Sequence, residues 1–279
     1  MKTVPHWKIL MCACVINPSD NPSADAVYVY DGSFDGFLCC VYESVYGGEF
    51  PLQITSALTQ ETLLPVREIV TDGSRAGRVL ASIPRKISDR ALELTQTVFL
   101  SCLPEKELRL LRALLRGYRE GGRLYSSLGD ADIAPLLMAE RHLYMEAHLF
   151  KGFVRFSDYG GTLAGTITPK NFVLPFLASH FSLRYDNENW LLFDKTHKAA
   201  LMYEGRRTEN CRTPGRRARL ISIEHMDMPA VSEEEARYQS LWRHFYDTVA
   251  IEARENPRCR MTHMPKRYWE NMLEVRELV

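Results

Sequence analysis

The 279-residue sequence lacks the paired cysteine spacings that are typical of disulfide frameworks and metal sites. Its seven cysteines are an odd number. They include neither a C-x-x-C pair nor the C-x-x-x-C-x-x-C triplet that holds the iron–sulfur cluster of radical-SAM enzymes. The chain is therefore not expected to be such an enzyme. The cysteine usage favours a reducing cytoplasm, and no pattern indicates a metal or a cofactor.

Long apolar runs and an excess of one charge are also missing. The longest stretch without Asp, Glu, Lys or Arg runs from Asn171 to Leu183, well short of the roughly 18 residues that span a bilayer, so we expect no membrane segment. The 35 basic and 35 acidic side chains cancel. Any affinity for a polyanion must therefore come from local clusters of charge.

The remaining pattern is typical of an α+β fold. Residues 1–26 end in a turn-rich stretch and are expected to form a poorly ordered extension, and residues 27–279 to form a single domain. That domain divides into a helix-rich part over about 74–148 and a hairpin-rich part over about 149–204. We expect a mainly antiparallel sheet, two hairpins around a helix, packed with the helical region and a long C-terminal helix.

The domain is expected to open with a strand, a turn and a helix. Val27 to Tyr30 reads as the strand, Asp31-Gly32 turns the chain, and Ser33 can cap the helix that follows. The hairpin-rich part alternates as strands do, around a predicted helix that carries Leu174, Leu177 and Phe181. Its expected strands are Leu149 to Phe156, Thr162 to Thr168, Trp190 to Phe193 and Ala199 to Tyr203.

The long C-terminal helix is predicted from a capping box formed by Ser232 and Glu235. Its residues Tyr238, Trp242, Phe245 and Val249 repeat at the spacing of a core face, and Asn256-Pro257 is expected to end it.

Basic residues cluster in two places. A helix beginning near Pro104 carries an arginine stripe, which is either a phosphate-contacting surface or a solvated helix face: Arg109, Arg112, Arg116 and Arg119. The segment from Gly205 to Arg219 has six arginines against one glutamate and is expected to be an exposed loop.

Several stretches, taken in order, resemble a bacterial family described as putative DNA metabolism or DNA repair proteins. They are Tyr28 to Leu38, Glu146 to Phe156, His180 to Arg184, Trp190 to Asp194, and Tyr238 to Trp242 with Met264 to Trp269. Members accompany a radical-SAM protein assigned to DNA modification or repair, and related domains are fused to uracil-DNA glycosylase domains. The resemblance therefore implies a DNA-directed accessory role, with DNA and a radical-SAM protein as partners. It implies no particular reaction.

Two sets of residues could carry chemistry. The first could do acid–base work or could simply hold the fold by hydrogen bonds: Glu146, His148, His180 and Asp194. The second set could bind phosphate or nucleic acid. Alternatively, its members could form ion pairs within the protein or simply face solvent: Arg155, Arg184, Arg206, Arg207, Arg216, Arg217, Lys266 and Arg267. Lys266 and Arg267 precede Tyr268-Trp269, which could stack a base or be buried in the core.

Three functions follow from these residues. The first hypothesis is a DNA- or partner-binding accessory protein to a separate radical-SAM enzyme. The second is a self-sufficient nucleic-acid-processing enzyme, a hydrolase or glycosylase, that uses the four acid–base candidates. The third is a structural protein-interaction module whose arginines meet acidic partners.

Overall fold

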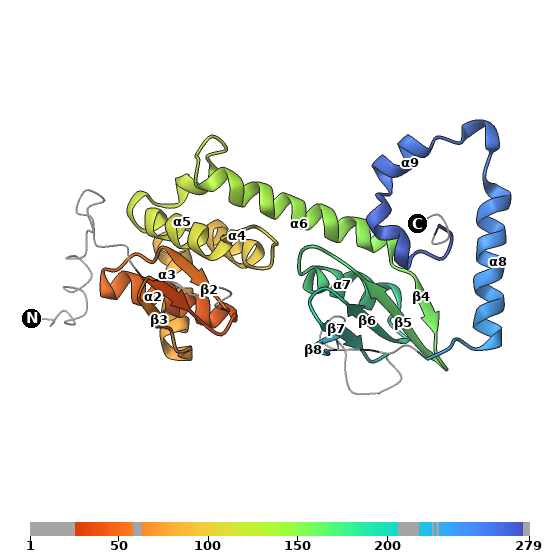
Figure 1. The fold of residues 1–279 in the computed structure, drawn as a ribbon, viewed down its shortest axis with the longest axis horizontal. Coiled ribbons are helices and arrows are strands. Elements are labelled where there is room, and N and C mark those ends of the chain that lie inside the picture. Colours follow the sequence, from red (N-terminus) through yellow and green to blue (C-terminus); the bar gives the residue numbers. More distant parts are fainter. Residues whose placement is uncertain (1–25, 58–62, 206–217, 225, 227–228, 276–279) are drawn as a thin grey trace, which may run out of the picture. The chain divides into compact units, whose positions relative to one another are not determined.

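The computed structural model describes residues 26–57, 63–205, 218–224, 226 and 229–275. It divides the chain into two compact units, Met1–Arg141 (unit 1) and His142–Val279 (unit 2). Helices and two sheets confirm the expected α+β class (Figure 1). Nearly all of the expected N-terminal extension lies outside the described residues.

Unit 1 is built on a small parallel sheet. Strand β1 (Val27–Val29) lies between β2 (Gln53–Thr55) and β3 (Val66–Glu68) and is parallel to both. Helix α2 (Phe34–Gly47) follows β1, which confirms the predicted strand, turn and helix. Helix α3 (Gly73–Lys86) follows β3. The parallel pairing differs from the mainly antiparallel sheet that the sequence predicted.

The junction between β1 and α2 is held by short-range hydrogen bonds. Asp31 Oδ1 accepts from the backbone N of Ser33 at 2.9 Å and from its hydroxyl at 2.7 Å. The Ser33 hydroxyl in turn accepts from the N of Gly36 at 2.9 Å, the N-cap bond of α2. Thr71 Oγ1 donates to Asp31 Oδ2 at 2.8 Å and ties the start of α3 to the same carboxylate.

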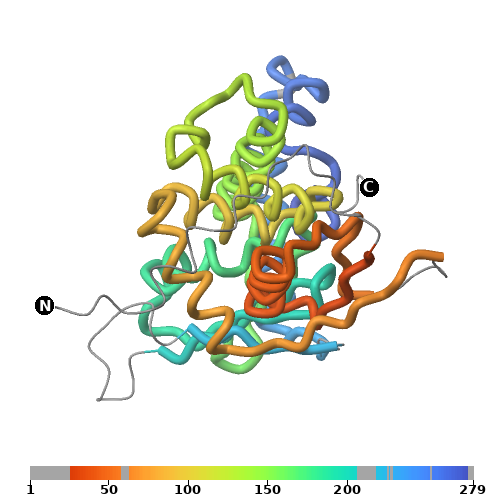
Figure 2. Tube along the Cα trace, turned by 90° about the vertical axis from the view of Figure 1, so that its left-hand side faces the viewer, coloured from red at the N-terminus to blue at the C-terminus, as the bar shows by residue number. Residues whose placement is uncertain are grey.

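The remaining helices of unit 1 pack on this layer. They are α4 (Asp89–Phe99), α5 (Lys106–Glu120) and the short η1 (Gly122–Ser126), followed by α6 (Ile133–Phe153), which runs on into unit 2. Figure 2 follows the chain through unit 1 from β1 in red to α6 in green. The core is apolar and continuous, with Phe37, Leu111 and Leu136 among its fully buried residues.

Unit 2 is built on a five-stranded sheet in the order β4-β5-β6-β7-β8. The strands are β4 (Phe156–Asp158), β5 (Thr162–Ile167), β6 (Asn189–Asp194), β7 (Ala199–Tyr203) and β8 (Ala218–Ser222). Helix α7 (Leu174–Arg184) connects β5 to β6, which are parallel, and the other pairs are antiparallel. Both predicted hairpins and the helix between them are therefore confirmed.

Two predicted boundaries in unit 2 are wrong. A strand was expected from Leu149 to Phe156, but α6 continues to Phe153 and β4 begins only at Phe156. Buried Ala147 and Phe150 lie three residues apart, a spacing that a helix also satisfies. Arg219 was assigned to a loop, but it lies in β8, where it pairs with Met202.

The C-terminal part of unit 2 consists of α8 (Glu233–Val249), η2 (Glu252–Arg254), α9 (Pro257–His263) and η3 (Lys266–Asn271). Ser232 caps α8 as predicted. However, α8 ends at Val249, and Asn256 caps α9 instead of ending α8. The expected core face of α8 is also wrong, because this helix has no buried residue. Among the described residues, no helix is long and apolar enough to cross a membrane.

Candidate nucleic-acid interface

Glu146 lies on α6 and is almost fully buried, with its side chain 2% exposed. Its carboxylate accepts from the backbone N of Lys170 at 3.0 Å and of Asn171 at 2.8 Å, and from the Asn171 side chain at 2.6 Å. Arg267 completes the set with an ion pair at 3.0 Å. The structure thus brings together two of the sequence-predicted residues, Glu146 and Arg267. These four donors satisfy the carboxylate. Through them it binds two segments to α6, namely the loop that follows β5 and the short helix η3.

His148 is exposed, whereas Glu146 is buried, and both lie inside α6. The sequence placed this pair at a helix-to-strand junction, where alternation could bring His148 onto a common face with a neighbour. In a helix, residues two apart point to nearly opposite sides. The structure therefore does not bring His148 and Glu146 together.

Asp194 lies at the end of β6 with its side chain fully buried. Oδ1 accepts from the backbone N of Thr196 at 2.9 Å and of His197 at 3.1 Å, while Oδ2 lies 2.7 Å from His197 Nδ1. These bonds close the hairpin between β6 and β7. Sequence reasoning missed His197 as the partner, although a carboxylate three residues before a histidine in a turn was the available signal.

Arg155 forms a two-pronged ion pair with Glu274, at 2.5 Å and 3.3 Å. It also donates to the carbonyl oxygen of Gly152 at 2.8 Å, near the C-terminal end of α6. Burial raises the pKa of Glu274, but hydrogen bonds from Arg155 and Trp242 outweigh it, so the net pKa is lowered. The positive charge of Arg155 is therefore matched within unit 2.

Lys266 and Arg267 each lie against an aromatic ring. The Arg267 guanidinium is 4.5 Å from the centroid of Tyr268, and the Lys266 ammonium is 5.6 Å from that of Trp269. Both rings are buried, and the Trp269 Nε1 donates to the carbonyl of Met264 at 2.8 Å. The rings therefore serve the core in this structure, and the cations cover them.

The C-terminal end of α6 and helix α7 carry a second group of cations. His180 is hydrogen-bonded to the backbone of Lys151, and Arg184 lies one turn after His180 on α7. The pKa of His180 is lowered by burial first and then by the charges of Lys151 and Arg184. We call Lys151 and Arg184, whose charges both act on the His180 ring, the α6–α7 cationic surface.

This surface keeps its positive charge. Lys151 and Arg184 are exposed, and among the described residues neither has a carboxylate within ion-pair distance. Arg184 donates to the Tyr185 hydroxyl at 3.4 Å, a neutral partner. His148 is exposed on α6 one turn before Lys151. His180 is half-buried, and its buried Nε2 has no hydrogen-bond partner among the described atoms.

Sequence reasoning found His148, His180 and Arg184 but missed Lys151. The missed signal was the length of α6: once the helix extends to Phe153, Lys151 falls on the same side as His148 and Tyr144. The ring centroids of Tyr144 and of Phe176 on α7 lie 5.4 Å apart, so this side of α6 faces α7.

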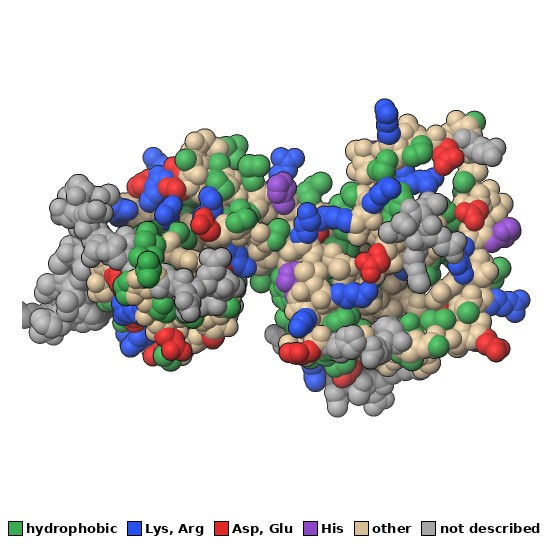
Figure 3. All heavy atoms as spheres, viewed as in Figure 1, with side chains coloured by type: hydrophobic (Ala, Val, Ile, Leu, Met, Phe, Trp, Pro, Cys, Tyr) green, Lys and Arg blue, Asp and Glu red, His purple; other side chains and the backbone are tan. Residues whose placement is uncertain are grey.

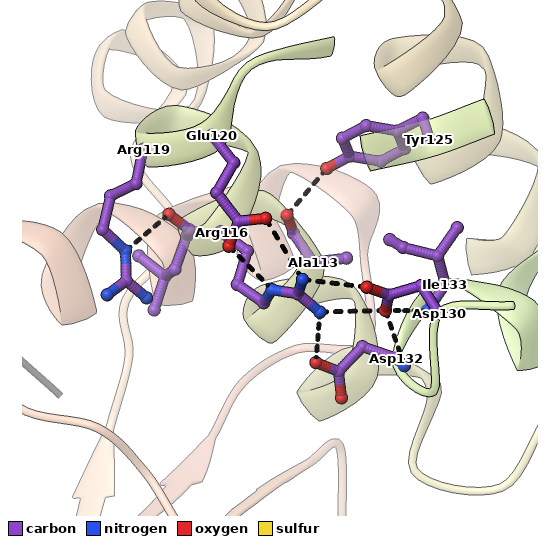
Figure 4. Close-up of polar contacts among 9 residues, drawn as sticks. Ala113, Arg116, Arg119, Glu120, Tyr125, Asp130, Asp132 and Ile133 are labelled. Carbon is purple, nitrogen blue, oxygen red and sulfur yellow. Dashed lines mark hydrogen bonds and ion pairs between the residues drawn. The ribbon is translucent and has the colours of Figure 1, made fainter. Parts of the chain in front are cut away.

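Within the arginine stripe of α5, Arg116 is neutralised by carboxylates of unit 1 (Figure 4). Arg116 binds Asp130 at 2.9 Å, Asp132 at 2.8 Å and Glu120 at 3.0 Å. Arg109 pairs loosely with Glu105 at 3.9 Å, and Arg112 lies over the Phe50 ring. The stripe therefore does not present four unmatched charges, and the solvated-face interpretation fits it better.

The basic loop predicted from Gly205 to Arg219 is described only at its two ends. Its candidate phosphate contacts, Arg206, Arg207, Arg216 and Arg217, lie outside the described residues. On the face shown in Figure 3, Lys and Arg side chains are interspersed with Asp and Glu over the described surface. Exposed cations without a carboxylate at ion-pair distance among the described residues occur in both units, for example Arg78 and Arg112 in unit 1 and Lys151 and Arg184 in unit 2.

The four acid–base candidates have different partners. Glu146 is bound to Arg267 and Asp194 to His197, while His180 lies beside Lys151 and His148 faces solvent. A cavity of about 240 Å³ in unit 2 lies along β5, β6 and β7, from Thr162 to Glu204, and none of the four lines it. Within the described part of the chain, no group of three or more His, Cys, Asp and Glu could hold a metal ion.

Comparison with known proteins adds a family. A family model described as a domain of unknown function, DUF4130, matches residues 104–274. None of the curated proteins matches the sequence. A solved structure of a pGpG-specific phosphodiesterase from Vibrio cholerae aligns over 82% of this chain and 100% of its own, with 11% identity and a TM-score of 0.30. A likeness at that level supports no inference about this chain.

Proposed function

The chain belongs to the family of the domain of unknown function DUF4130, and we propose that it is a DNA-metabolism accessory protein that binds nucleic-acid phosphates at the α6–α7 cationic surface. The observation that carries the proposal is the contrast between two kinds of cation. Arg116, Arg155 and Arg267 are matched by carboxylates, whereas Lys151 and Arg184 have none among the described residues.

Two exposed cations on adjacent helices suit a phosphate backbone. Each phosphate that a Lys or Arg neutralises releases condensed counterions, and this release drives binding without reading sequence. Arg184 can in addition present two parallel N–H donors to one phosphate, while Lys151 acts as a point charge. The surface lies within the residues that match the family model. The four acid–base candidates do not converge on one site among the described residues, so binding is better supported than catalysis.

The accessory role rests on the family resemblance of the sequence. That resemblance implies a separate radical-SAM enzyme that performs the chemistry on DNA, and the chain has no cysteine triplet of its own for such a cluster. In this proposal the chain supplies affinity for the DNA backbone, and the enzyme supplies the reaction.

Direct binding tests the proposal. Fluorescence anisotropy of labelled single-stranded and duplex DNA at physiological salt should give dissociation constants for the wild-type chain of about 10⁻⁴ to 10⁻⁶ M, the usual range of sequence-independent binding, and tighter binding at low salt. The double variant Lys151→Glu, Arg184→Glu should bind at least about tenfold more weakly, because two attractive contacts become repulsive.

The matched control is a double charge reversal at two exposed arginines of unit 1, Arg78→Glu on α3 with Arg112→Glu on α5, which also lack a carboxylate at ion-pair distance among the described residues and change the net charge equally. It should leave DNA binding nearly unchanged. Equal loss in both double variants would mean that only net charge matters, and no binding by the wild type at low salt would contradict the proposal. Gel filtration of the chain co-expressed with the radical-SAM enzyme of its host tests the accessory role separately.

A further inference from the structure

His180 connects α7 to the last turn of α6. Its ring is half-buried and is hydrogen-bonded to the backbone of Lys151. Burial lowers the pKa of His180 overall, but this hydrogen bond raises it, as a bond from the ring to an acceptor does. The acceptor is therefore the Lys151 carbonyl oxygen. Lys151 lies in the last turn of α6, where carbonyl oxygens have no partner within the helix, so the histidine satisfies a helix end.

The second ring nitrogen of His180 is unused. Nε2 is buried and has no hydrogen-bond partner among the described atoms, so the bond to the Lys151 backbone comes from Nδ1. A buried polar atom without a partner costs free energy, and native structures contain few of them. Because Nδ1 is held by the Lys151 carbonyl, Nε2 is the ring atom that a ligand can use.

The charged side chains that act on this ring are cations. Lys151 comes from α6, and Arg184 lies one turn after His180 on α7. Neither has a carboxylate within ion-pair distance among the described residues. The Phe181 ring, whose centroid lies 5.0 Å from that of His180, is uncharged. These surroundings favour an anion at Nε2 over a metal ion or an organic cation.

We propose that His180 is a third phosphate-binding residue of the α6–α7 cationic surface and that it binds a DNA phosphate through Nε2 in its protonated form. The inference rests on the proposed function, because it takes the phosphate that Lys151 and Arg184 attract. A protonated imidazole donates from both nitrogens, so Nδ1 keeps the Lys151 carbonyl while Nε2 donates to a phosphate oxygen. Such a charge-assisted bond is stronger than one between neutral groups.

Protonation of His180 makes the binding of DNA depend on pH. Burial and the two neighbouring cations lower its pKa below the ordinary value of about 6.5, so the ring of the free protein is neutral at neutral pH. A bound phosphate stabilises the charged ring and raises that pKa in the complex. The affinity should therefore rise as the pH falls through the pKa of the complex, and it should level off below the pKa of the free protein.

Fluorescence anisotropy with labelled duplex DNA, repeated from about pH 8 to about pH 5 at constant ionic strength, tests the inference. The wild-type chain should bind about tenfold more tightly at the acidic end, which corresponds to a difference of about one unit between the two pKa values. His180→Gln removes the titrating group and should abolish most of this rise. His148→Gln is the matched control, since His148 is exposed on α6 one turn before Lys151, and it should keep the rise.

A histidine that only caps α6 gives a different result. In that case His180→Gln lowers the melting temperature but leaves the pH profile of DNA binding as in the wild type, and this outcome would overturn the inference while the proposed function stands. A titration of the wild-type imidazole protons by NMR needs no variant. Saturating duplex DNA should raise the pKa of His180, and an unchanged pKa would equally contradict the inference. A wild-type chain that binds no DNA at any pH would contradict the proposed function and this inference together.

Discussion

At the scale of single residues, the partner of each arginine decides what it does. Arg116 lies among three carboxylates, and Arg155 and Arg267 each satisfy a buried glutamate. A guanidinium held in this way organises the fold and has little charge left for a ligand. Lys151 and Arg184 differ because neither has a carboxylate within ion-pair distance among the described residues, and Arg184 lies against the Tyr185 ring. The proposed phosphate contacts rest on that difference.

Arg155→Ala should destabilise unit 2 strongly. The substitution leaves Glu274, whose side chain is 2% exposed, without its charged partner. An unmatched buried charge costs on the order of 3 kcal/mol, to be measured as the free energy of unfolding in urea. Adding Glu274→Gln should recover part of the loss, because the neutral amide needs no counter-charge. A double variant no more stable than Arg155→Ala alone would contradict this account of the pair.

Arg116→Gln should make the stability of unit 1 less dependent on pH. Hydrogen bonds from Arg116 are the main cause of the lowered pKa of both Glu120 and Asp130. A carboxyl whose folded pKa is lowered stabilises the fold above its ordinary value near 4, and the stabilisation is lost as the pH falls through the lower folded pKa. The melting temperature of the variant should therefore fall below that of the wild type at pH 7, and the difference should shrink at acidic pH.

The control for that experiment is Arg112→Gln on the same helix, since the Arg112 guanidinium lies over the Phe50 ring. Its effect on the melting temperature should be nearly the same at every pH. A pH-independent effect of Arg116→Gln would show that the three carboxylates do not depend on Arg116.

At the scale of elements, the junction of β1 and α2 leaves no space for a side chain at position 36. A Cβ at Gly36 would lie 2.2 Å from Asp31 Oδ1 and 2.9 Å from Thr71 Oγ1. No side chain fits there while Asp31 binds Ser33 and Thr71. The glycine is therefore required by close approach, whatever its helix propensity.

Gly36→Ala should lower the free energy of unfolding by roughly 2 kcal/mol, because it displaces Asp31 and loosens the cap of α2. Gly77→Ala in α3 is the matched control, since the space around Gly77 is open. That change should stabilise the protein by up to about 1 kcal/mol through helix propensity. Urea unfolding of the two variants should thus give changes of opposite sign, and equal changes would contradict the packing described at Gly36.

The sequence predicted those elements that have strong local signals. Ser33 and Ser232 mark helix starts, and Leu174, Leu177 and Phe181 mark α7. Strands of three residues, such as β2 and β3, are too short to show a period, so the parallel sheet of unit 1 was not predicted. The end of α6 was misplaced because Leu149 to Phe153 satisfies both a strand and a helix pattern.

The candidate site was only partly predictable. Sequence spacing identified His180 and Arg184 on one helix, but Lys151 joins them only through the packing of α6 on α7. The predicted core face of α8, formed by Tyr238, Trp242, Phe245 and Val249, shows a different limit of sequence spacing. Its spacing indicates a face that must be covered, but spacing cannot say whether the cover comes from the same chain or from another.

At the scale of the whole molecule, equal numbers of acidic and basic residues give the chain no general attraction for DNA. Attraction must come from places where positive charge is left unmatched. In unit 2 the described residues leave Lys151 and Arg184 unmatched, whereas α8 carries a net negative charge. DNA binding is therefore expected at the α6–α7 cationic surface and not along α8.

The salt dependence of DNA binding tests this account most directly. For duplex DNA, the slope of log K against log salt concentration falls by about 0.9 for each phosphate contact that is lost. Lys151→Gln with Arg184→Gln should therefore reduce the magnitude of the slope by roughly 1.8, whereas Arg78→Gln with Arg112→Gln should leave it unchanged. An unchanged slope for the Lys151 and Arg184 variant would show that DNA does not contact the α6–α7 cationic surface.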